Sequence, residues 1–258
     1  SGSAMVNTTF TELSQSTTDT TKSPAACANN SNYDMFVWND GGTIRCTRGP
    51  AWSTDTARGT GAGSTELVRI NGLWTNKNAI TNGPAASRGT YVGTIRTNGT
   101  ATVDNAINAR HVWNAYNRTT HSFVLEITTD SWTYSSATWR QVQASSTYQV
   151  SFVCGLDEEL VTASYYAVYN TSTSTSRAAT VGIGLDSLTQ PHILYMSGNA
   201  SAGQWSGFPV GTYYGFPGIG YHYLAMLERG AGSDTQTWYG DAGIPLNLQL
   251  GLSGTIMS

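Results

Sequence analysis

The chain has 258 residues, of which 11% are charged and another 11% aromatic, and its formal net charge at pH 7 is -3. Typical soluble domains carry about 25% charged residues, so hydroxyl and amide side chains supply most of the polar surface here. With only Lys22 and Lys77 as lysines and scattered arginines, the chain lacks the basic surface that binds nucleic acid. No run approaches the roughly 20 apolar residues of a membrane span, so membrane insertion is also excluded.

The beginning of the chain differs in composition from the rest. Residues 1–5 resemble an expression-tag remnant. Residues 6–32 are rich in Ser and Thr, contain few large apolar side chains and are interrupted by Pro24. They predict an extended N-terminal arm or linker. Residues 33–258 then predict a single β-sandwich domain, a size that is common for all-β proteins.

Two hairpins are predicted next. Asn39–Gly42 is a turn cluster between the β-prone segments 33–38 and 43–47. Asn71-Gly72 is the strongest kind of two-residue turn signal, and it joins segments 66–70 and 73–75. Residues 90–97 predict a further strand.

One short α-helix is predicted near residues 103–117. Thr102 or Asp104 supplies an N-cap, and Ile107, Arg110 and His111 fall on neighbouring turns of such a helix. Helices are otherwise not indicated, so the predicted fold class is all-β with this one exception.

The rest of the chain reads as strands separated by turn residues. They are predicted at 122–127, 131–134, 139–143, 148–154, 161–169 and 178–185, with a closing hairpin of 221–228 and 235–239 and a final strand over 246–250. A spacing of about 8–12 residues between strands is typical of sandwiches and barrels. The expected architecture is an antiparallel, jelly-roll-like β-sandwich.

Residues 197–220 predict a long structured loop that is rich in Gly, Pro and aromatic side chains. Long loops in compact domains are usually functional, and aromatic rings provide contact area at low entropic cost. The predicted ligand or partner contacts are Trp205, Phe208, Tyr213, Tyr214 and Phe216 of this segment, with His222 as the wall of an aromatic cluster. The same rings would also suit burial against a neighbouring subunit.

Cysteine and histidine give no metal motif. Cys27, Cys46 and Cys154 are odd in number and lack C-x-x-C spacing, so we expect buried free thiols, with one bridged pair as the alternative. The four histidines show no i, i+4 pair. No metal site and no cofactor is predicted.

Catalytic signatures are equally lacking in the sequence. It contains no G-x-S-x-G elbow, P-loop or dinucleotide fingerprint. Asp157-Glu158-Glu159 is expected at a solvated hairpin tip, and no pair of carboxyl groups has a surrounding motif. We therefore predict no catalytic residues and a protein that is not an enzyme.

A resemblance covers nearly everything after about residue 30. It is carried by Arg88–Thr97, Asp104 and Ala109–Arg118, by Tyr33–Phe36, Trp52, Thr56–Arg58 and Gly72 upstream, and by Gly220–Leu224 and Trp238–Gly240 downstream. These residues resemble a family of tailed-bacteriophage virion proteins with the order R-Y-x-G-T-x-x-T followed by V-W-N-x-Y-N-R. The resemblance implies location at the surface of a virion, a homotrimer and contacts with other virion proteins. Asn114, Asn117 and Arg118 are then expected to fix the helix end, with Arg118 bound to free carbonyl groups.

Three functions follow as hypotheses. The first is a non-enzymatic virion surface protein, a fibre or host-adsorption domain that contacts a host glycan or receptor. The second is a capsid decoration or cement protein whose arm lies along the shell. The third is a polysaccharide depolymerase, which would release reducing ends from host capsule.

Overall fold

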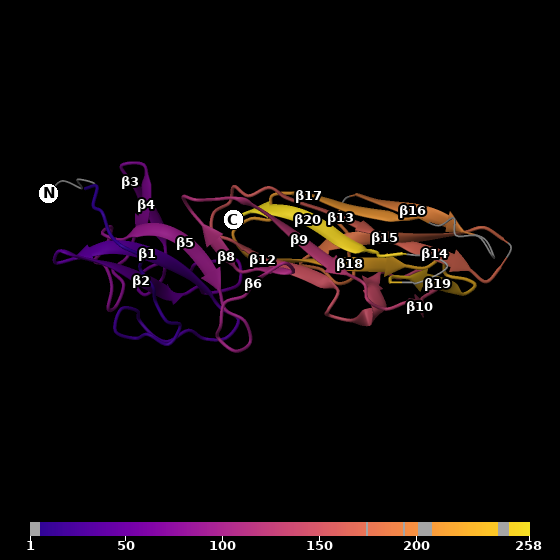
Figure 1. The fold of residues 1–258 in the computed structure, drawn as a ribbon, viewed down its shortest axis with the longest axis horizontal. Coiled ribbons are helices and arrows are strands. Elements are labelled where there is room, and N and C mark those ends of the chain that lie inside the picture. Colours follow the sequence, from indigo (N-terminus) through magenta and orange to yellow (C-terminus); the bar gives the residue numbers. More distant parts are fainter. Residues whose placement is uncertain (1–5, 174, 193, 201–207, 242–247) are drawn as a thin grey trace.

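The computed structural model describes residues 6–173, 175–192, 194–200, 208–241 and 248–258. Trp205 and the first two residues of the strand predicted over 246–250 therefore lie outside the described residues, and residues 248–250 form no strand. The described chain is elongated and divides into a smaller N-terminal lobe and a larger lobe (Figure 1). Nearly all its regular structure is β, as predicted.

The smaller lobe is one antiparallel sheet built around the two predicted hairpins. Asn39–Gly42 connects β1 to β2, and Asn71-Gly72, both residues at positive φ, connects β3 to β4. The strand order is β2 (Thr43–Ala51), β1 (Asn32–Asp40), β5 (Thr90–Arg96), β4 (Leu73–Asn76) and β3 (Leu67–Ile70), and β8 (Val112–Asn114) also pairs with β5. Residues 6–31 contain no strand.

The larger lobe is a continuous sheet folded over into two facing layers. One layer holds β6 (Asn105–Ala106), β7 (Ala109–Arg110), β12 (Gln149–Cys154), β18 (Gly220–Arg229) and β15 (Arg177–Leu185), with β11 (Arg140–Gln141) on β18. The other holds β17 (Val210–Gly215), β13 (Val161–Tyr166), β20 (Gly251–Met257) and β9 (Thr120–Glu126), so β20 lies between β13 and β9.

The strand β16 (Leu194–Ala200) joins the two layers. Its second half pairs with β15 and its first half with β17. The apolar residues of both inner faces form a single core that includes Phe152, Ile183, Leu224, Tyr165 and Leu252. The predicted β-sandwich is thus confirmed, whereas a jelly-roll order of its strands stays a prediction.

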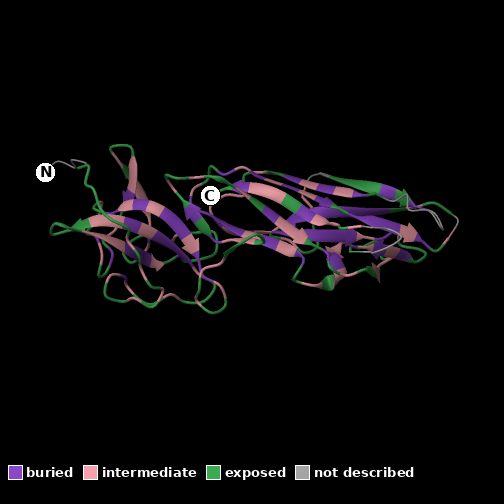
Figure 2. Cartoon of the chain, in the orientation of Figure 1, coloured by how far each residue is buried: buried purple, intermediate pink, exposed green. Residues whose placement is uncertain are grey.

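A small third sheet completes the far end of this lobe. It contains β10 (Ser131–Thr133), β19 (Gln236–Tyr239) and β14 (Val168–Thr171), and a single 3-10 turn, η1 (Val142–Ala144), follows β11. Trp238 is buried between the rings of Trp132 and Tyr169, at centroid distances of 6.5 and 5.0 Å. Figure 2 shows that buried positions lie along the strands of both lobes, and exposed ones on the loops and the N-terminal residues.

The α-helix predicted near 103–117 is wrong. The segment forms β6, β7 and β8, and Ile107, placed on the helix by its spacing, is exposed at the turn between β6 and β7. The segment pairs with the edges of two longer strands instead of forming a helix. β7 pairs in parallel with β12, and β8 pairs antiparallel with β5. Gly93 makes the second pairing possible because a Cβ there would collide with the Trp113 carbonyl.

Four smaller predictions also require correction. In the loop predicted over 197–220, residues 197–200 belong to β16 and residues 210–215 form β17. The strands β18 and β19 belong to different sheets instead of one hairpin. The segment 161–169 breaks at Ala167 into β13 and β14, which lie in separate sheets. The last strand is β20, over 251–257.

The three cysteines are free thiols, and Cys154 is buried. Among the described residues, no helix is long and apolar enough to cross a bilayer.

Candidate contact face and lobe junction

The outer face of the layer formed by β17, β13, β20 and β9 carries small hydroxyl side chains in rows. Antiparallel register places Tyr214, Thr162, Thr255 and Ser122 in one row. The next row holds Thr212, Ser164, Ser253 and Val124. Successive side chains of a strand point to opposite faces, so the intervening Ala163, Tyr165 and Leu252 are buried in the core.

Aromatic rings stand at both ends of this outer face, which we call the contact face. Tyr214 ends one row, and Tyr166 lies in the row with Val210 and Glu126 at the other end. Both tyrosine rings are at least half exposed, and so are Phe208 and Phe216, which flank β17. The two rows are four residues apart along β17, or about 13 Å at the usual strand rise.

A groove of about 430 Å³ lies at the Tyr166 end of the contact face. Its walls include Tyr166, Phe208, Val210 and Leu250, and Glu126 is the charged side chain that lines it. Apolar walls with a few polar groups are typical of ligand sites. Within the three described rows, Glu126 is also the only charged side chain, so the face is almost free of strong fields.

The structure divides the predicted contact residues into two groups. Phe208, Tyr214 and Phe216 are exposed as expected, whereas Tyr213 and His222 are buried. Tyr213 follows the opposite face of β17 and packs its ring against His192, 4.8 Å away. His222 Nδ1 pairs with the Asp186 carboxylate at 2.7 Å, and its ring lies against Phe152.

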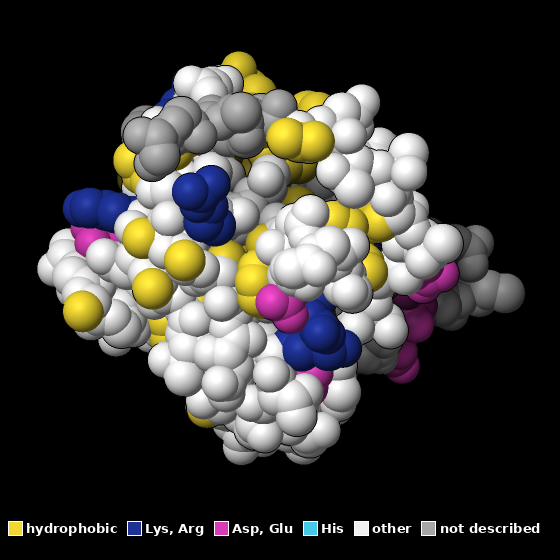
Figure 3. Space-filling model, turned by 90° about the vertical axis from the view of Figure 1, so that its left-hand side faces the viewer, with side chains coloured by type: hydrophobic (Ala, Val, Ile, Leu, Met, Phe, Trp, Pro, Cys, Tyr) yellow, Lys and Arg dark blue, Asp and Glu magenta, His cyan; other side chains and the backbone are white. Residues whose placement is uncertain are grey.

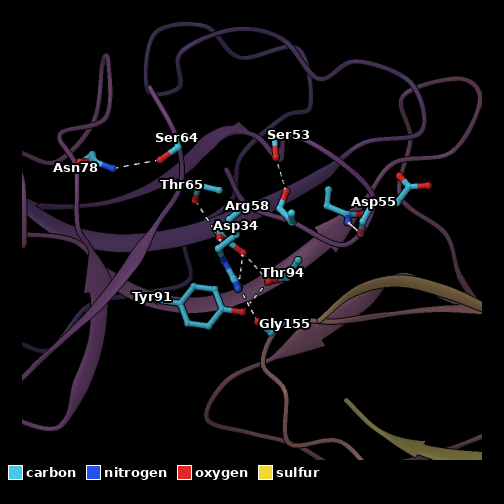
Figure 4. Close-up of polar contacts among 12 residues, drawn as sticks. Asp34, Ser53, Asp55, Arg58, Ser64, Thr65, Asn78, Tyr91, Thr94 and Gly155 are labelled. Atoms are coloured by element: carbon cyan, nitrogen blue, oxygen red, sulfur yellow. Dashed lines mark hydrogen bonds and ion pairs between the residues drawn. The ribbon is translucent and has the colours of Figure 1, made fainter. Parts of the chain in front are cut away.

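A second cluster, which we call the lobe junction, gathers residues from distant parts of the chain. The Asp34 carboxylate is fully buried and accepts hydrogen bonds from Arg58 Nε (2.6 Å), Thr65 Oγ1 (2.9 Å) and Thr94 Oγ1 (2.7 Å). Arg58 Nη2 also donates to the Gly155 carbonyl at 2.6 Å. Figure 4 shows that Arg58 thereby connects the smaller lobe to the loop after β12 of the larger one.

Electrostatics keep Arg58 charged and Tyr91 neutral in this cluster. Burial lowers the pKa of Arg58, but the Asp34 charge and its hydrogen bonds outweigh that effect and leave the pKa above its ordinary value. Burial raises the pKa of Tyr91 well above its usual range, with the Asp34 charge acting in the same direction. Tyr91 therefore stays neutral and donates to Thr94 Oγ1 (2.6 Å).

Apolar packing and cation–π contacts reinforce the junction. Val153 of β12 is buried in the same small core as Phe36, Tyr91 and Trp113. Arg96 of β5 stacks on the Tyr221 ring of β18, with 3.7 Å from its guanidinium carbon to the ring centroid. The two lobes therefore share a core and several polar contacts, as expected of a rigid connection.

Two predicted roles near the junction need correction. Arg118 pairs with the carboxylates of Glu158 and Glu159 and does not bind free carbonyl groups at a helix end. Glu159 is buried, so of the three acidic residues expected at a solvated tip only Asp157 and Glu158 are exposed. Asn114 has a local role, because its side-chain oxygen accepts from the backbone N–H groups of Tyr116 and Asn117.

His111 makes the junction sensitive to acid. It is buried at the link between β7 and β8, its Nε2 lies 2.8 Å from Ser151 Oγ of β12, and its Nδ1 has no hydrogen-bond partner among the described residues. Burial lowers the pKa of His111 to about 4; Asp104 raises it and Arg96 lowers it further. The unfolded chain thus binds this proton below about pH 6.5, while the folded chain binds it only near pH 4.

When the pH is lowered from 7.5 to 4.5, we expect the unfolding free energy of the wild type to fall by about 2–3 kcal/mol because of this histidine. The loss begins below about pH 6.5. His111→Gln removes the titrating group, so the same pH change should cost that variant less by this amount. Urea unfolding of both proteins at the two pH values measures the difference. Equal pH dependence in both proteins would contradict the assignment.

The sequence analysis missed the hydroxyl rows and Tyr166. The signal was present in Thr162-Ala163-Ser164-Tyr165, where small hydroxyl residues alternate with core residues. Comparison with known proteins adds no further assignment, because neither a protein-family model nor a curated protein matches the sequence.

Proposed function

We propose that this chain is a non-enzymatic virion surface protein that contacts host surface polysaccharide through the contact face. The observation that carries the proposal is a nearly uncharged sheet face with rows of hydroxyl groups between exposed aromatic rings. Aromatic rings cover the apolar faces of sugar rings, and side-chain hydroxyls exchange hydrogen bonds with sugar hydroxyls. The phage-like motifs support location on a virus particle.

Two further features fit this function. The exposed rings lie in two rows about 13 Å apart, one at each end of the contact face. This separation suits an extended polymer better than a single small molecule. A neutral face makes the contact insensitive to ionic strength, which is useful for a protein that acts outside cells. Binding to polysaccharide should therefore change little between about 50 and about 500 mM salt, unlike a contact made by charges.

Truncation of the exposed rings tests the proposal. Tyr166→Ala and Tyr214→Ala are each expected to weaken binding to purified host polysaccharide roughly tenfold, because exposed aromatic side chains dominate contact energies. Biolayer interferometry with immobilised polysaccharide measures the affinities. Tyr195→Ala is the matched control: Tyr195 is 53% exposed, against 50% for Tyr166, but points away from the contact face.

Each of the other functions predicts a different result. A decoration protein would bind capsids that lack it and would ignore polysaccharide, and a depolymerase would release reducing ends from it. Either outcome, or equal binding by the Tyr166 and Tyr195 variants, would overturn the proposal.

A further inference from the structure

The smaller lobe has a groove on the side of its sheet that faces away from the shared core. The groove measures about 760 Å³, and its lining combines the apolar side chains of Val37, Ile44, Ile70 and Val92 with polar ones such as Asn39 and Ser87. These residues follow from strand alternation: Phe36 and Tyr91 point into the core, so their neighbours Val37 and Val92 point outward. Figure 3 looks onto this end of the molecule and shows hydrophobic side chains at the surface with few charged ones.

The N-terminal residues are the part of the chain that lies along this groove. Val6 and Phe10 contribute to its lining, yet they are 78% and 57% exposed. Residues 6–14 make no hydrogen bond or ion pair with any other described residue. Their apolar side chains are thus placed beside an apolar surface that one copy of the chain covers incompletely.

The following residues are fixed to the sheet. The Arg48 guanidinium is buried and donates to the carbonyl oxygens of Ser16 (3.1 Å), Asp19 (3.1 Å) and Ala25 (2.6 Å). Asn82 Nδ2 donates to the Thr20 carbonyl at 2.9 Å. Residues 6–14 therefore lie against the groove without hydrogen bonds and are anchored only at their C-terminal end, and nine extended residues can reach about 30 Å.

We infer that the groove and residues 6–14 form a self-association surface, in which this segment of one copy lies in the groove of the next. The occupant is a second copy because every copy carries both an open groove and the exposed apolar side chains of Val6 and Phe10, so two copies are complementary to each other. Charge is complementary as well: Glu12 is the charged residue of the segment, and Arg88 on the groove is exposed with no side-chain partner among the described residues.

Exchange of the segment preserves its contacts with the groove and brings a neighbouring lobe over the exposed faces of Val6 and Phe10. Such exchange of an identical element is a low-cost route to oligomers. Because each copy gives one segment and receives one, copies related by rotation close into a ring. The inference does not depend on what the contact face binds.

Photocrosslinking tests the exchange directly. The photoreactive residue benzoylphenylalanine in place of Phe10 is expected to link separate chains on irradiation, and the same residue in place of the exposed Tyr214 provides the control. Denaturing gels should show covalent oligomers for position 10 and single chains for position 214. Linkage at position 10 confined to single chains would overturn the inference.

Light scattering gives an independent measurement. The full chain is expected to be oligomeric at about 100 µM, because a self-association with a Kd of about 1–10 µM is nearly complete at that concentration. Removal of residues 1–14, or Phe10→Asp with the chain otherwise intact, should give a monomer with unchanged circular dichroism, because the contacts of Arg48 begin at Ser16. A monomeric full chain, or an oligomer that persists in both variants, would contradict the inference.

Discussion

Asp34→Ala is expected to lower the unfolding free energy by about 3–5 kcal/mol. The substitution leaves the buried Arg58 guanidinium without its counter-charge and removes the acceptor of Thr65 and Thr94. A buried charge that has lost its partner is costly because neither water nor protein compensates it. Urea or guanidinium unfolding followed by tryptophan fluorescence measures the loss.

The same strand supplies the control. Asp40 also lies in β1 and also pairs with an arginine, Arg45, but both side chains are more than a third exposed. Exposed pairs typically contribute about 0.2–1 kcal/mol, so Asp40→Ala should have a small effect. Equal effects of the two substitutions would show that the lobe junction does not depend on the buried pair.

Glu228→Ala is expected to cost a similar amount, about 3 kcal/mol or more. Glu228 is fully buried and accepts hydrogen bonds from Trp132 Nε1 (2.6 Å), Arg140 Nε (2.8 Å) and the Gln143 backbone N–H (3.0 Å). Burial raises the pKa of Glu228, whereas these hydrogen bonds and the Arg140 charge lower it, and the effect of burial is larger. The alanine variant leaves all three donors without an acceptor.

Glu158 is the matched control for this second prediction. It pairs with Arg118 at 2.9 Å, but its side chain is exposed. Glu158→Ala should therefore change the unfolding free energy by less than about 1 kcal/mol. Since Glu228 lies in the larger lobe, its effect should also add to that of Asp34→Ala in the double variant, within about 0.5 kcal/mol. Strong coupling between the two sites would contradict this picture.

The sandwich could be predicted from sequence because the strands follow simple patterns. Alternation and turn residues located most of the strands, and Asn71-Gly72 marked its hairpin correctly. The helix near 103–117 failed because its residues pair with strands that are distant in sequence, β5 and β12. Helical spacing in a short segment is weak evidence when an open strand edge is available.

The contact residues show how one wrong element misplaces a site. Adjacent residues such as Tyr213 and Tyr214 are equally exposed in a loop, but they point to opposite faces in a strand. Because 210–215 is β17, Tyr214 is on the surface and Tyr213 in the core. The lobe junction was harder to foresee, since Asp34, Arg58, Thr94 and Gly155 meet only through long-range pairing. Its residues were noticed as a motif, but nothing in the motif indicated which carboxylate is buried.

The position of β20 has a consequence for synthesis on the ribosome. β20 lies between β13 and β9, so this layer stays incomplete until residues 251–257 have been translated. The sheet of the smaller lobe uses only residues 32–114 and is available much earlier. In the interval, β13 and β9 have open edges and Tyr165 and Phe123 are uncovered, a condition that favours aggregation. Added chaperones should therefore raise the soluble yield, because they cover the open edges of the larger lobe during this interval.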